Sequence, residues 1–298
     1  MNRFPDHARV CFLGDSITAN GRFVALIADC YKKNFPKSGI RFYDCGTPGG
    51  GVSWLLRTFD RDIAVHQPTH AIVMIGINDS RRDLLAQPRT PERYCALLEA
   101  YETYKTNLRT LITRLQALGT QVTLVSLPPC AEFQPGDSPN LPGSYALTLG
   151  YAAAMQAIAL ECGCGFTDLH AFMTEKMQTE DLYAPDRVHP TPKGHLYMAE
   201  AILQDQGLTP ASGAEEEHIS ALQEKLLDFR RIMAVEYLVI NDETLSDEEK
   251  LARVRQYLEE KQWARPNVMN FREVSERYLV TKPIEREYAA EMEALLTV

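Results

Sequence analysis

Short apolar runs alternate with longer amphipathic stretches over roughly the first two thirds of the chain. Five of these runs have the length of strands and are bounded by turn residues, and they predict strands at residues 9–13, 40–45, 71–75, 121–127 and, more weakly, 165–168. The stretches between them place apolar residues on one helical face, and they predict helices at residues 22–34, 52–66, 91–118, 145–162 and 193–206.

This alternation of strands and helices predicts an α/β domain with a parallel sheet. Strands that are apolar along almost their whole length are buried on both faces, so helices must cover both sides. The expected architecture is a three-layer α/β/α domain with a flavodoxin-like parallel sheet. Right-handed crossovers bring the carboxyl ends of the strands to one edge, where sheets of this kind bind their ligands.

The composition changes near residue 210. Residues 1–210 contain 16 of the 17 glycines and 15 of the 17 prolines, and their net charge is −2. Residues 211–298 contain one glycine, Gly213, and their net charge is −7. A glycine-punctuated part followed by a charged part with almost no glycine is typical of an α/β domain followed by helices. We therefore predict an α/β domain over residues 1–210 and a helical extension over residues 211–298.

The overall charge and the cysteines narrow the class of protein. The 298 residues include 31 basic and 40 acidic ones, and a net charge of −9 disfavours nucleic acid and anionic membranes as partners. The seven cysteines are odd in number and lack the spacing of a disulfide framework. No run near the start resembles a signal peptide, and none approaches the ~20 apolar residues that span a bilayer. We expect a cytoplasmic protein.

A serine follows the first predicted strand, in the run Gly14-Asp15-Ser16. Where a strand passes into a helix, a serine presents its hydroxyl and its N–H at the sheet edge, with the helix dipole behind it. The structural alternative is that Ser16 is a helix N-cap, which is a common role for serine.

The second and third predicted strands are followed by groups that can donate hydrogen bonds. Gly49, Gly50 and Gly51 leave backbone N–H groups open to a ligand, but the Lys-Ser/Thr of a P-loop is absent. Asn78 stands just beyond the third strand and can point an amide donor at a developing oxyanion. A turn or cap residue is the alternative for Asn78, and we expect such a structural role for Asp79.

An acid and a histidine stand three residues apart in Asp186-Arg187-Val188-His189-Pro190. In a tight turn, Asp186 can bond one ring nitrogen of His189 and fix its tautomer, which leaves the other nitrogen free to take a proton from a serine. Capping or packing is the alternative for His189, and we expect only these roles for the other six histidines.

In this order the motifs resemble those of the SGNH hydrolases, also called GDSL-type esterases. The resemblance covers about residues 8–205. It implies that Ser16 is the nucleophile, that His189 is the general base, and that Asp186 is the acid that orients the base.

The resemblance also implies an oxyanion hole formed by the Ser16 N–H, the Gly49 N–H and the Asn78 side chain. The family's glycine block reads roughly Asn-x-Gly-x-x-Gly, whereas this chain has Asp44 in place of the leading asparagine and Pro48 before the expected donor. If the loop is shifted by one residue, Gly50 is the donor instead.

The implied reaction is a two-step acyl transfer through an acyl-enzyme, with no metal and no cofactor. The family acts on small acyl esters, often acetylated sugars, so the expected substrate is a small-molecule or carbohydrate ester. Arg22, Trp54 and Tyr183 flank the motifs and are candidates for lining a substrate pocket, with packing as the alternative for each.

Three other functions are compatible with the chain. An acyltransferase would use the same triad and pass the acyl group to a sugar or peptide. A binding or scaffold module would keep the fold without catalysis. A flavodoxin-like nucleotide binder fits the order of strands but has no use for the Asp186–His189 motif.

Residues 211–298 lie outside the resemblance. A single helical stripe is predicted from Ile219, Leu222, Leu226, Phe229 and Met233. Ser246 and Glu249 have the spacing of a capping box that opens a second helix. Such one-sided helices either cap their own domain or form a homodimer interface, which in the second case brings residues such as Trp263 near a neighbouring site.

Overall fold

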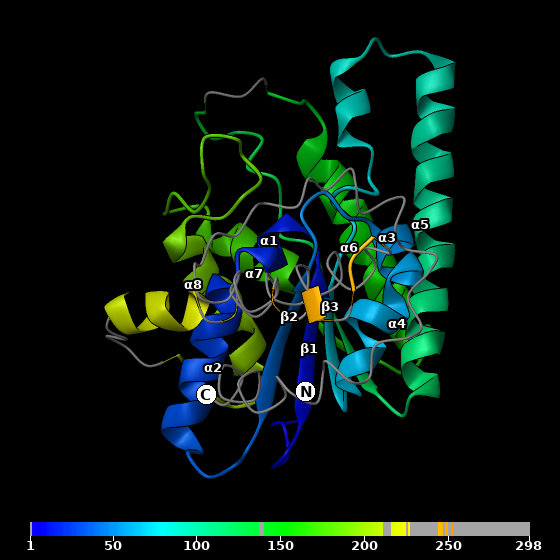
Figure 1. Cartoon of the computed structure of the whole chain (residues 1–298). Coiled ribbons are helices and arrows are strands. Elements are labelled where there is room, and N and C mark those ends of the chain that lie inside the picture. The colour runs from blue at the N-terminus through cyan, green and yellow to red at the C-terminus, as the bar shows by residue number, and fades with distance from the viewer. Residues whose placement is uncertain are drawn as a thin grey trace.

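The computed structural model of the chain (Figure 1) describes residues 2–136, 140–210, 216–224, 226, 244–246, 248–249 and 252. Among these residues, five parallel strands form one sheet in the order β2-β1-β3-β4-β5. The strands are β1 (Arg9–Gly14), β2 (Arg41–Gly46), β3 (His70–Met74), β4 (Gln121–Val125) and β5 (Gly165–Thr167). The predicted parallel sheet is confirmed, and its order is that of flavodoxin-like folds.

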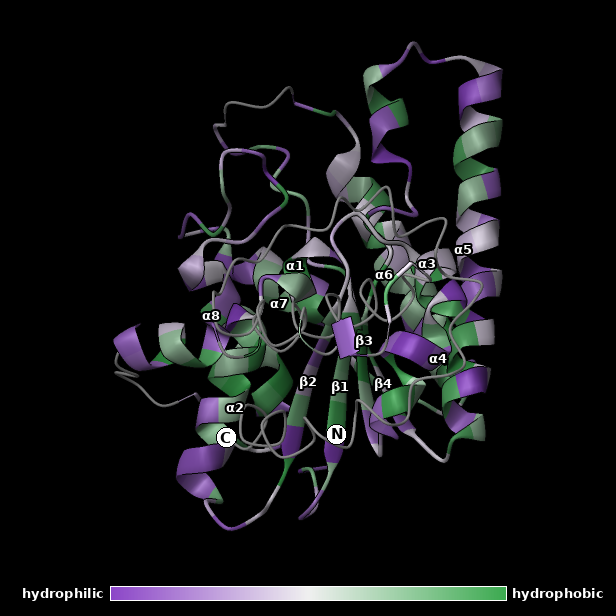
Figure 2. Ribbon diagram, viewed as in Figure 1, coloured by the Kyte–Doolittle hydropathy of each residue, from purple (hydrophilic) through white to green (hydrophobic). Residues whose placement is uncertain are grey.

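Helices cover both faces of the sheet, and hydrophobic strand residues lie between them (Figures 1 and 2). One face packs against α2 (Arg22–Asn34), α7 (Leu169–Lys176) and α8 (Pro192–Gln204), and the other against α3 (Val52–Arg57), α5 (Pro91–Ala117) and α6 (Ser144–Glu161). Side chains alternate along β1, so that Val10 and Phe12 join the first core and Cys11 and Leu13 the second. The predicted three-layer α/β/α architecture is confirmed.

The carboxyl ends of β1, β2 and β3 lie side by side. Gly14 at the end of β1 pairs with Gly46 in β2 and with Met74 in β3. Both glycines allow the short helix α1 (Ser16–Ala19) to pack closely on this edge. A Cβ on Gly14 would lie 2.0 Å from Thr18 Oγ1, and one on Gly46 would lie 2.3 Å from the Ala19 nitrogen. The segments that follow β1, β2 and β3 therefore meet at the carboxyl edge of the sheet.

The prediction of a single helix over residues 52–66 is wrong. The structure has α3, α4 (Phe59–Asp62) and a 3₁₀ turn, η1 (Ala64–His66), in its place. Arg114 on α5 donates a hydrogen bond of 2.8 Å to the Leu56 carbonyl, and its guanidinium carbon stacks 4.0 Å above the centre of the Phe59 ring. A continuous helix would direct that carbonyl to the N–H four residues further on, whereas here it accepts a hydrogen bond from a distant helix.

Of the other predicted helices, α2 has the predicted bounds, and the ends of α5, α6 and α8 lie within two residues of the predicted ones. The predictions did not include α7 or the 3₁₀ helix η2 (Arg82–Ala86). Within the described part of the chain, no helix has both the length and the apolar character needed to cross a membrane.

The extension is described only in part. Residues 216–224 and 226, which we call the C-terminal segment, are helical, and Ile219, Leu222 and Leu226 are buried in the same core as α2 and α8. The capping box is confirmed, because the Ser246 N–H bonds Glu249 at 2.8 Å and the Glu249 N–H bonds Ser246 Oγ at 3.3 Å. Phe229, Met233 and Trp263 lie outside the described residues, and the homodimer interface stays a prediction.

Candidate active site

Ser16 is the first residue of α1, immediately beyond the end of β1. Asp15 caps this helix, because its Oδ1 accepts a hydrogen bond of 2.9 Å from the Ile17 N–H. The alternative that Ser16 serves as the N-cap is therefore wrong. As a first-turn group, the Ser16 N–H has no acceptor inside the helix and is open to a ligand.

The carboxyl group of Asp15 is buried. The residue is 1% exposed, and burial raises the pKa of its carboxyl to about 7. An acidic residue directly before a helix is a recognised start signal, so the sequence contained the evidence for this cap, although the sequence analysis did not use it.

Ser16, His189 and Asp186 form a continuous hydrogen-bonded chain at the carboxyl edge of the sheet. Ser16 Oγ lies 2.7 Å from His189 Nε2, and His189 Nδ1 lies 2.5 Å from Asp186 Oδ2. The serine and the histidine are 173 positions apart in the chain. Folding therefore joins two motifs that the sequence could relate only through their order.

The turn that carries Asp186 also orients its carboxylate. Asp186 Oδ1 accepts hydrogen bonds of 2.9 Å from the N–H groups of Val188 and His189. Burial alone raises the pKa of Asp186, but these N–H groups and the His189 ring outweigh burial and hold the pKa below its usual value. An ionised carboxylate only accepts hydrogen bonds, so it places the ring proton on Nδ1 and leaves Nε2 as the acceptor toward Ser16.

Arg187 anchors this turn to a neighbouring loop. Its backbone has a φ of +62°, in the left-handed region, and its side chain reaches back across the turn. Arg187 Nε donates to the Gln134 carbonyl at 2.8 Å, and its Nη2 donates to the Gly136 carbonyl at 3.1 Å. The Ala184 N–H donates a hydrogen bond of 2.8 Å to the His189 carbonyl, which closes the turn.

The glycine loop after β2 distinguishes Gly49 from Gly50. Gly50 is buried, and its N–H donates a hydrogen bond of 2.9 Å to the Thr47 carbonyl within the loop. Gly49 is exposed with a φ of +73°, a conformation that suits glycine, and a Cβ there would meet nothing within 4 Å. The Gly50 N–H is thus already engaged, whereas the Gly49 N–H has no acceptor among the described residues.

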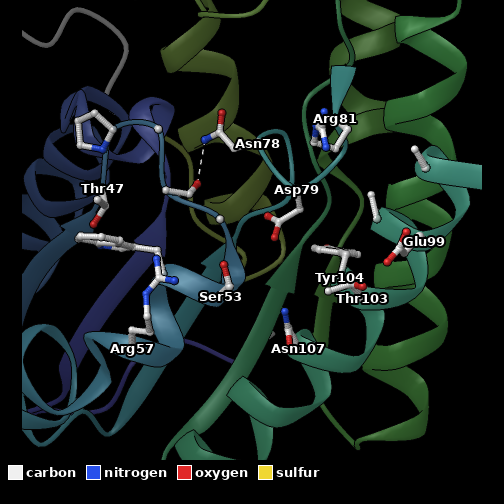
Figure 3. A pocket seen from close by; sticks show the side chains of 17 residues that line it. Thr47, Ser53, Arg57, Asn78, Asp79, Arg81, Glu99, Thr103, Tyr104 and Asn107 are labelled. Carbon is white, nitrogen blue, oxygen red and sulfur yellow. Dashed lines mark hydrogen bonds between the residues drawn. The ribbon is translucent and has the colours of Figure 1, made fainter. Parts of the chain in front are cut away.

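Asn78 lies beside this loop and is oriented by it. Its Nδ2 donates a hydrogen bond of 2.8 Å to the Gly50 carbonyl (Figure 3). A side-chain amide carries two N–H donors, so one remains for a ligand. The side chain is exposed, and the bond to Gly50 limits its rotation.

Asp79 has the structural role expected of it, but it caps a different helix from the one that follows. Its carboxylate accepts the Val52 N–H at 3.0 and 3.2 Å, at the start of α3. A Cβ on Gly51 would lie 2.7 Å from Asp79 Oδ1, so the contact is close. Burial raises the pKa of Asp79 to about 6. This residue connects the loop after β3 to the glycine loop.

A pocket of about 500 Å³ opens beside Gly49 and Asn78 (Figure 3). It lies between the glycine loop, α3 and α5, and the lining does not include Ser16 or His189. Its polar side chains include Ser53, Arg57, Arg81, Glu99 and Asn107. The sequence analysis missed these residues, because only tertiary packing brings α5 to this place.

The three candidates for pocket residues are found in different environments. Trp54 lines the pocket, with the Arg57 guanidinium carbon 5.3 Å from the centre of its ring. Arg22 instead bonds Glu216 of the C-terminal segment, at 2.6 Å between Nη2 and Oε2. Tyr183 is 4% exposed and packs in the core with its hydroxyl buried. Of the three, only Trp54 contributes to this pocket.

Among the described residues, no three His, Cys, Asp or Glu side chains come together as a metal ion would require. Cys162 and Cys164, the one closely spaced pair, are partly buried free thiols in the turn between α6 and β5.

The GDSL-like lipase/acylhydrolase family model matches residues 12–196. The chain belongs to this family. It is therefore a carboxylic ester hydrolase. A relative of known activity is an acetylxylan esterase from Geobacillus stearothermophilus, which is 30% identical over 220 residues, covering 67% of this chain and 94% of the relative.

Solved structures agree with this assignment. The acetylxylan esterase Axe2 from the same organism is 25% identical with a TM-score of 0.57, covering 70% of this chain and 98% of that one. LAE5, an alpha/beta hydrolase from the metagenome of Lake Arreo, is 25% identical with a TM-score of 0.55. The match covers 68% of this chain and 97% of LAE5. Other Axe2 structures are of catalytic mutants in which a serine, an aspartate or a histidine is replaced by alanine.

Proposed function

We propose that this enzyme is a serine esterase that removes acetyl groups from carbohydrate esters through a covalent acyl-enzyme. The observation that carries the proposal is the chain of hydrogen bonds from Ser16 Oγ to His189 Nε2, at 2.7 Å, and from His189 Nδ1 to Asp186, at 2.5 Å. The base stands within hydrogen-bond reach of both the nucleophile and the orienting acid, which is the arrangement that activates a serine.

The reaction follows from these positions. His189 Nε2 takes the Ser16 proton while Oγ attacks the ester carbonyl carbon. The tetrahedral intermediate then collapses, the bond to the alcohol oxygen breaks, and His189 returns the proton to that oxygen. Water attacks the acetyl-serine by the same route, releasing acetate and restoring Ser16. The ionised Asp186 stabilises the imidazolium formed in each step.

We assign the oxyanion hole to the Ser16 N–H, the Gly49 N–H and the Asn78 Nδ2. The hydrogen bond of the Gly50 N–H to the Thr47 carbonyl, at 2.9 Å, supports Gly49 as the donor. The contact of Asn78 with the Gly50 carbonyl keeps its amide beside the loop before substrate arrives. Donors oriented in advance stabilise the developing charge, and removal of one costs about 3–4 kcal/mol in comparable sites.

The pocket beside Gly49 and Asn78 supports a small polar substrate. It has room for a sugar unit, at about 500 Å³, and combines the indole of Trp54 with charged and amide side chains. Pockets that orient a ligand through a few polar groups beside an aromatic surface suit a carbohydrate. The similarity to an acetylxylan esterase over 94% of that protein also supports an acetylated sugar. In the solved catalytic mutants of Axe2, the replaced aspartate and histidine are three positions apart, as are Asp186 and His189.

A panel of esters tests this function. The enzyme is assayed with p-nitrophenyl acetate, butyrate and octanoate and with acetylated xylo-oligosaccharides, and products are identified by mass spectrometry. We expect turnover to fall with acyl length, and free acetate as the product from the sugars. Transfer of acetyl to a second sugar would indicate an acyltransferase, and equal turnover by wild type and Ser16→Ala would refute the serine mechanism.

A further inference from the structure

The C-terminal segment lies outside the residues that match the family, yet it contacts the end of the short helix α1, which begins at the proposed nucleophile. Ile219, Leu222 and Leu226 are 1%, 4% and 5% exposed, and they join the core formed by α2 and α8. Their spacing of three and four residues makes one helical stripe. The segment is therefore fixed to the α/β domain by buried apolar contacts.

Polar side chains of the same segment contact the corner where α1 passes into α2. Gln223 Nε2 donates to the Asn20 carbonyl at 2.7 Å and reaches its side-chain oxygen at 3.2 Å. Glu216 bonds Arg22 at 2.6 Å, and His218 Nε2 lies 3.1 Å from an oxygen of the buried Asp29. These contacts hold the end of α1 and the first turns of α2.

The contact of Gln223 leads directly to Ser16. Asn20 is the C-cap of α1, and its N–H donates a hydrogen bond of 3.1 Å to the Ser16 carbonyl. Two hydrogen bonds therefore connect the Gln223 side chain to the backbone of Ser16. Gly21, next in the chain, has a φ of +79°, and a Cβ there would lie 3.6 Å from Gln223 Cγ.

The helix between these anchors is too short to hold its own geometry. α1 has four residues, which is a single turn. Helix nucleation is unfavourable, so a single turn depends on tertiary contacts, here the packing of its buried residues Ile17, Thr18 and Ala19 and the hydrogen bonds at its two ends. Asp15 supplies the contact at the start through the Ile17 N–H, and Gln223 supplies one at the end through Asn20.

We propose that the C-terminal segment is a positioning element of this esterase, and that Gln223 is a positioning residue that holds Ser16 in place through Asn20. The inference rests on the proposed role of Ser16 as nucleophile. Displacing a reacting group by about 1 Å can lower a rate about 10²-fold, so loosening the end of α1 reduces the reactivity of Ser16. The buried apolar stripe keeps the segment attached when Gln223 alone is changed.

The test compares four full-length variants with the wild type. Gln223→Ala removes the donor, Gln223→Glu removes it with little change in size, and Gln223→Lys keeps a donor at the end of a long side chain. Glu217→Gln is the matched control, because Glu217 is exposed on the same helix. Measured for each are the inactivation rate with a fluorophosphonate, kcat and KM for p-nitrophenyl acetate, and Tm.

We expect the Ala and Glu variants to lose about five- to tenfold in inactivation rate and in kcat, with KM unchanged. Tm should stay close to that of the wild type, so a general loss of stability does not account for the effect. The inactivation rate and kcat of the Lys variant should remain within about twofold of the wild-type values. Those of Glu217→Gln should equal the wild-type values.

Wild-type reactivity in Gln223→Ala and Gln223→Glu would overturn the positioning role while leaving the esterase function intact. A loss of activity that follows a fall in Tm, or that Gln223→Lys does not restore, would also overturn the role of the donated hydrogen bond. A wild-type protein that neither reacts with the fluorophosphonate nor hydrolyses any ester would overturn the proposed function itself, and the inference with it.

Discussion

Ser16 and the turn that carries Asp186 and His189 are held in place in different ways. Ser16 follows β1 in the interior of the sheet, and its neighbours Asp15 and Ile17 are each 1% exposed. The side chains of His189 and Asp186 are 46% and 41% exposed. The serine depends on close backbone packing, whereas the turn depends on hydrogen bonds made by its own residues.

This difference predicts how the two regions respond to substitution. A change beside Ser16 alters buried groups, so it affects stability as well as rate. A change in the exposed turn removes hydrogen bonds without creating a cavity, so it affects rate while stability is largely preserved. Experiments that measure both quantities can separate the two regions.

The largest effect is expected from Ser16→Ala. Only the hydroxyl is removed, so the fold should persist, whereas kcat for p-nitrophenyl acetate should fall about 10⁴-fold or more. His189→Ala should be nearly as damaging, and the double variant should be no worse than either single one, because residues that act as a unit are not additive. A double variant far below both single variants would show that the two side chains act separately.

The second largest effect is expected from Asn78→Ala. Loss of one oxyanion donor lowers kcat about 10²–10³-fold with little change in KM, because the donor acts mainly in the transition state. Steady-state kinetics on p-nitrophenyl acetate measure both constants. If only KM changed, Asn78 would be a substrate-binding residue, and the assignment of the oxyanion hole would need revision.

Asp15→Asn tests the buried side of the comparison through the pH dependence of stability. Burial raises the folded-state pKa of Asp15 to about 7, above the ordinary 3.8. The contribution of Asp15 to stability is therefore full below about pH 4 and is lost as the pH rises through 7. Asparagine keeps the cap but cannot ionise. The free energy of unfolding of the variant, relative to that of the wild type, should therefore rise by about 2–3 kcal/mol as the pH increases from 5 to 8.

Denaturant unfolding at several pH values measures this gain. Asp181→Asn is the control, because Asp181 is exposed. A difference between Asp15→Asn and wild type that does not change with pH would contradict a buried, ionising Asp15.

The smallest effect is expected from Arg187→Ala, in the exposed turn. It removes the bonds to the Gln134 and Gly136 carbonyls, at 2.8 and 3.1 Å. The looser turn should lower kcat about tenfold, which corresponds to about 1.4 kcal/mol, while Tm changes little. Calorimetry together with kinetics checks both parts. A large fall in Tm would mean that the turn is as closely integrated with the core as Ser16 is.

Much of this protein could be predicted from the sequence, because the information was local. Strand and helix periodicity reports burial on each face, and it predicted the parallel sheet and most helices. Ser16 and Asn78 each stand in a short motif just beyond the carboxyl end of a strand, and Asp186 and His189 stand in a turn motif shortly before α8. Since parallel strands end at one edge, the sequence predicted that Ser16 and Asn78 lie close together. The resemblance to the SGNH hydrolases implied that Asp186 and His189 belong to the same site.

Tertiary structure alone decided the features that depend on contacts between distant segments. The helix predicted over residues 52–66 ends early, where the Leu56 carbonyl accepts a hydrogen bond from Arg114. The connection to the Ser16 backbone comes from Gln223, 203 positions after Asn20. The hydrogen bond of the Gly50 N–H to the Thr47 carbonyl distinguishes Gly50 from Gly49, which the sequence named as the donor with Gly50 as the alternative. Periodicity states which face of a segment is buried but not which side chain reaches it, because that depends on how the segments pack in three dimensions.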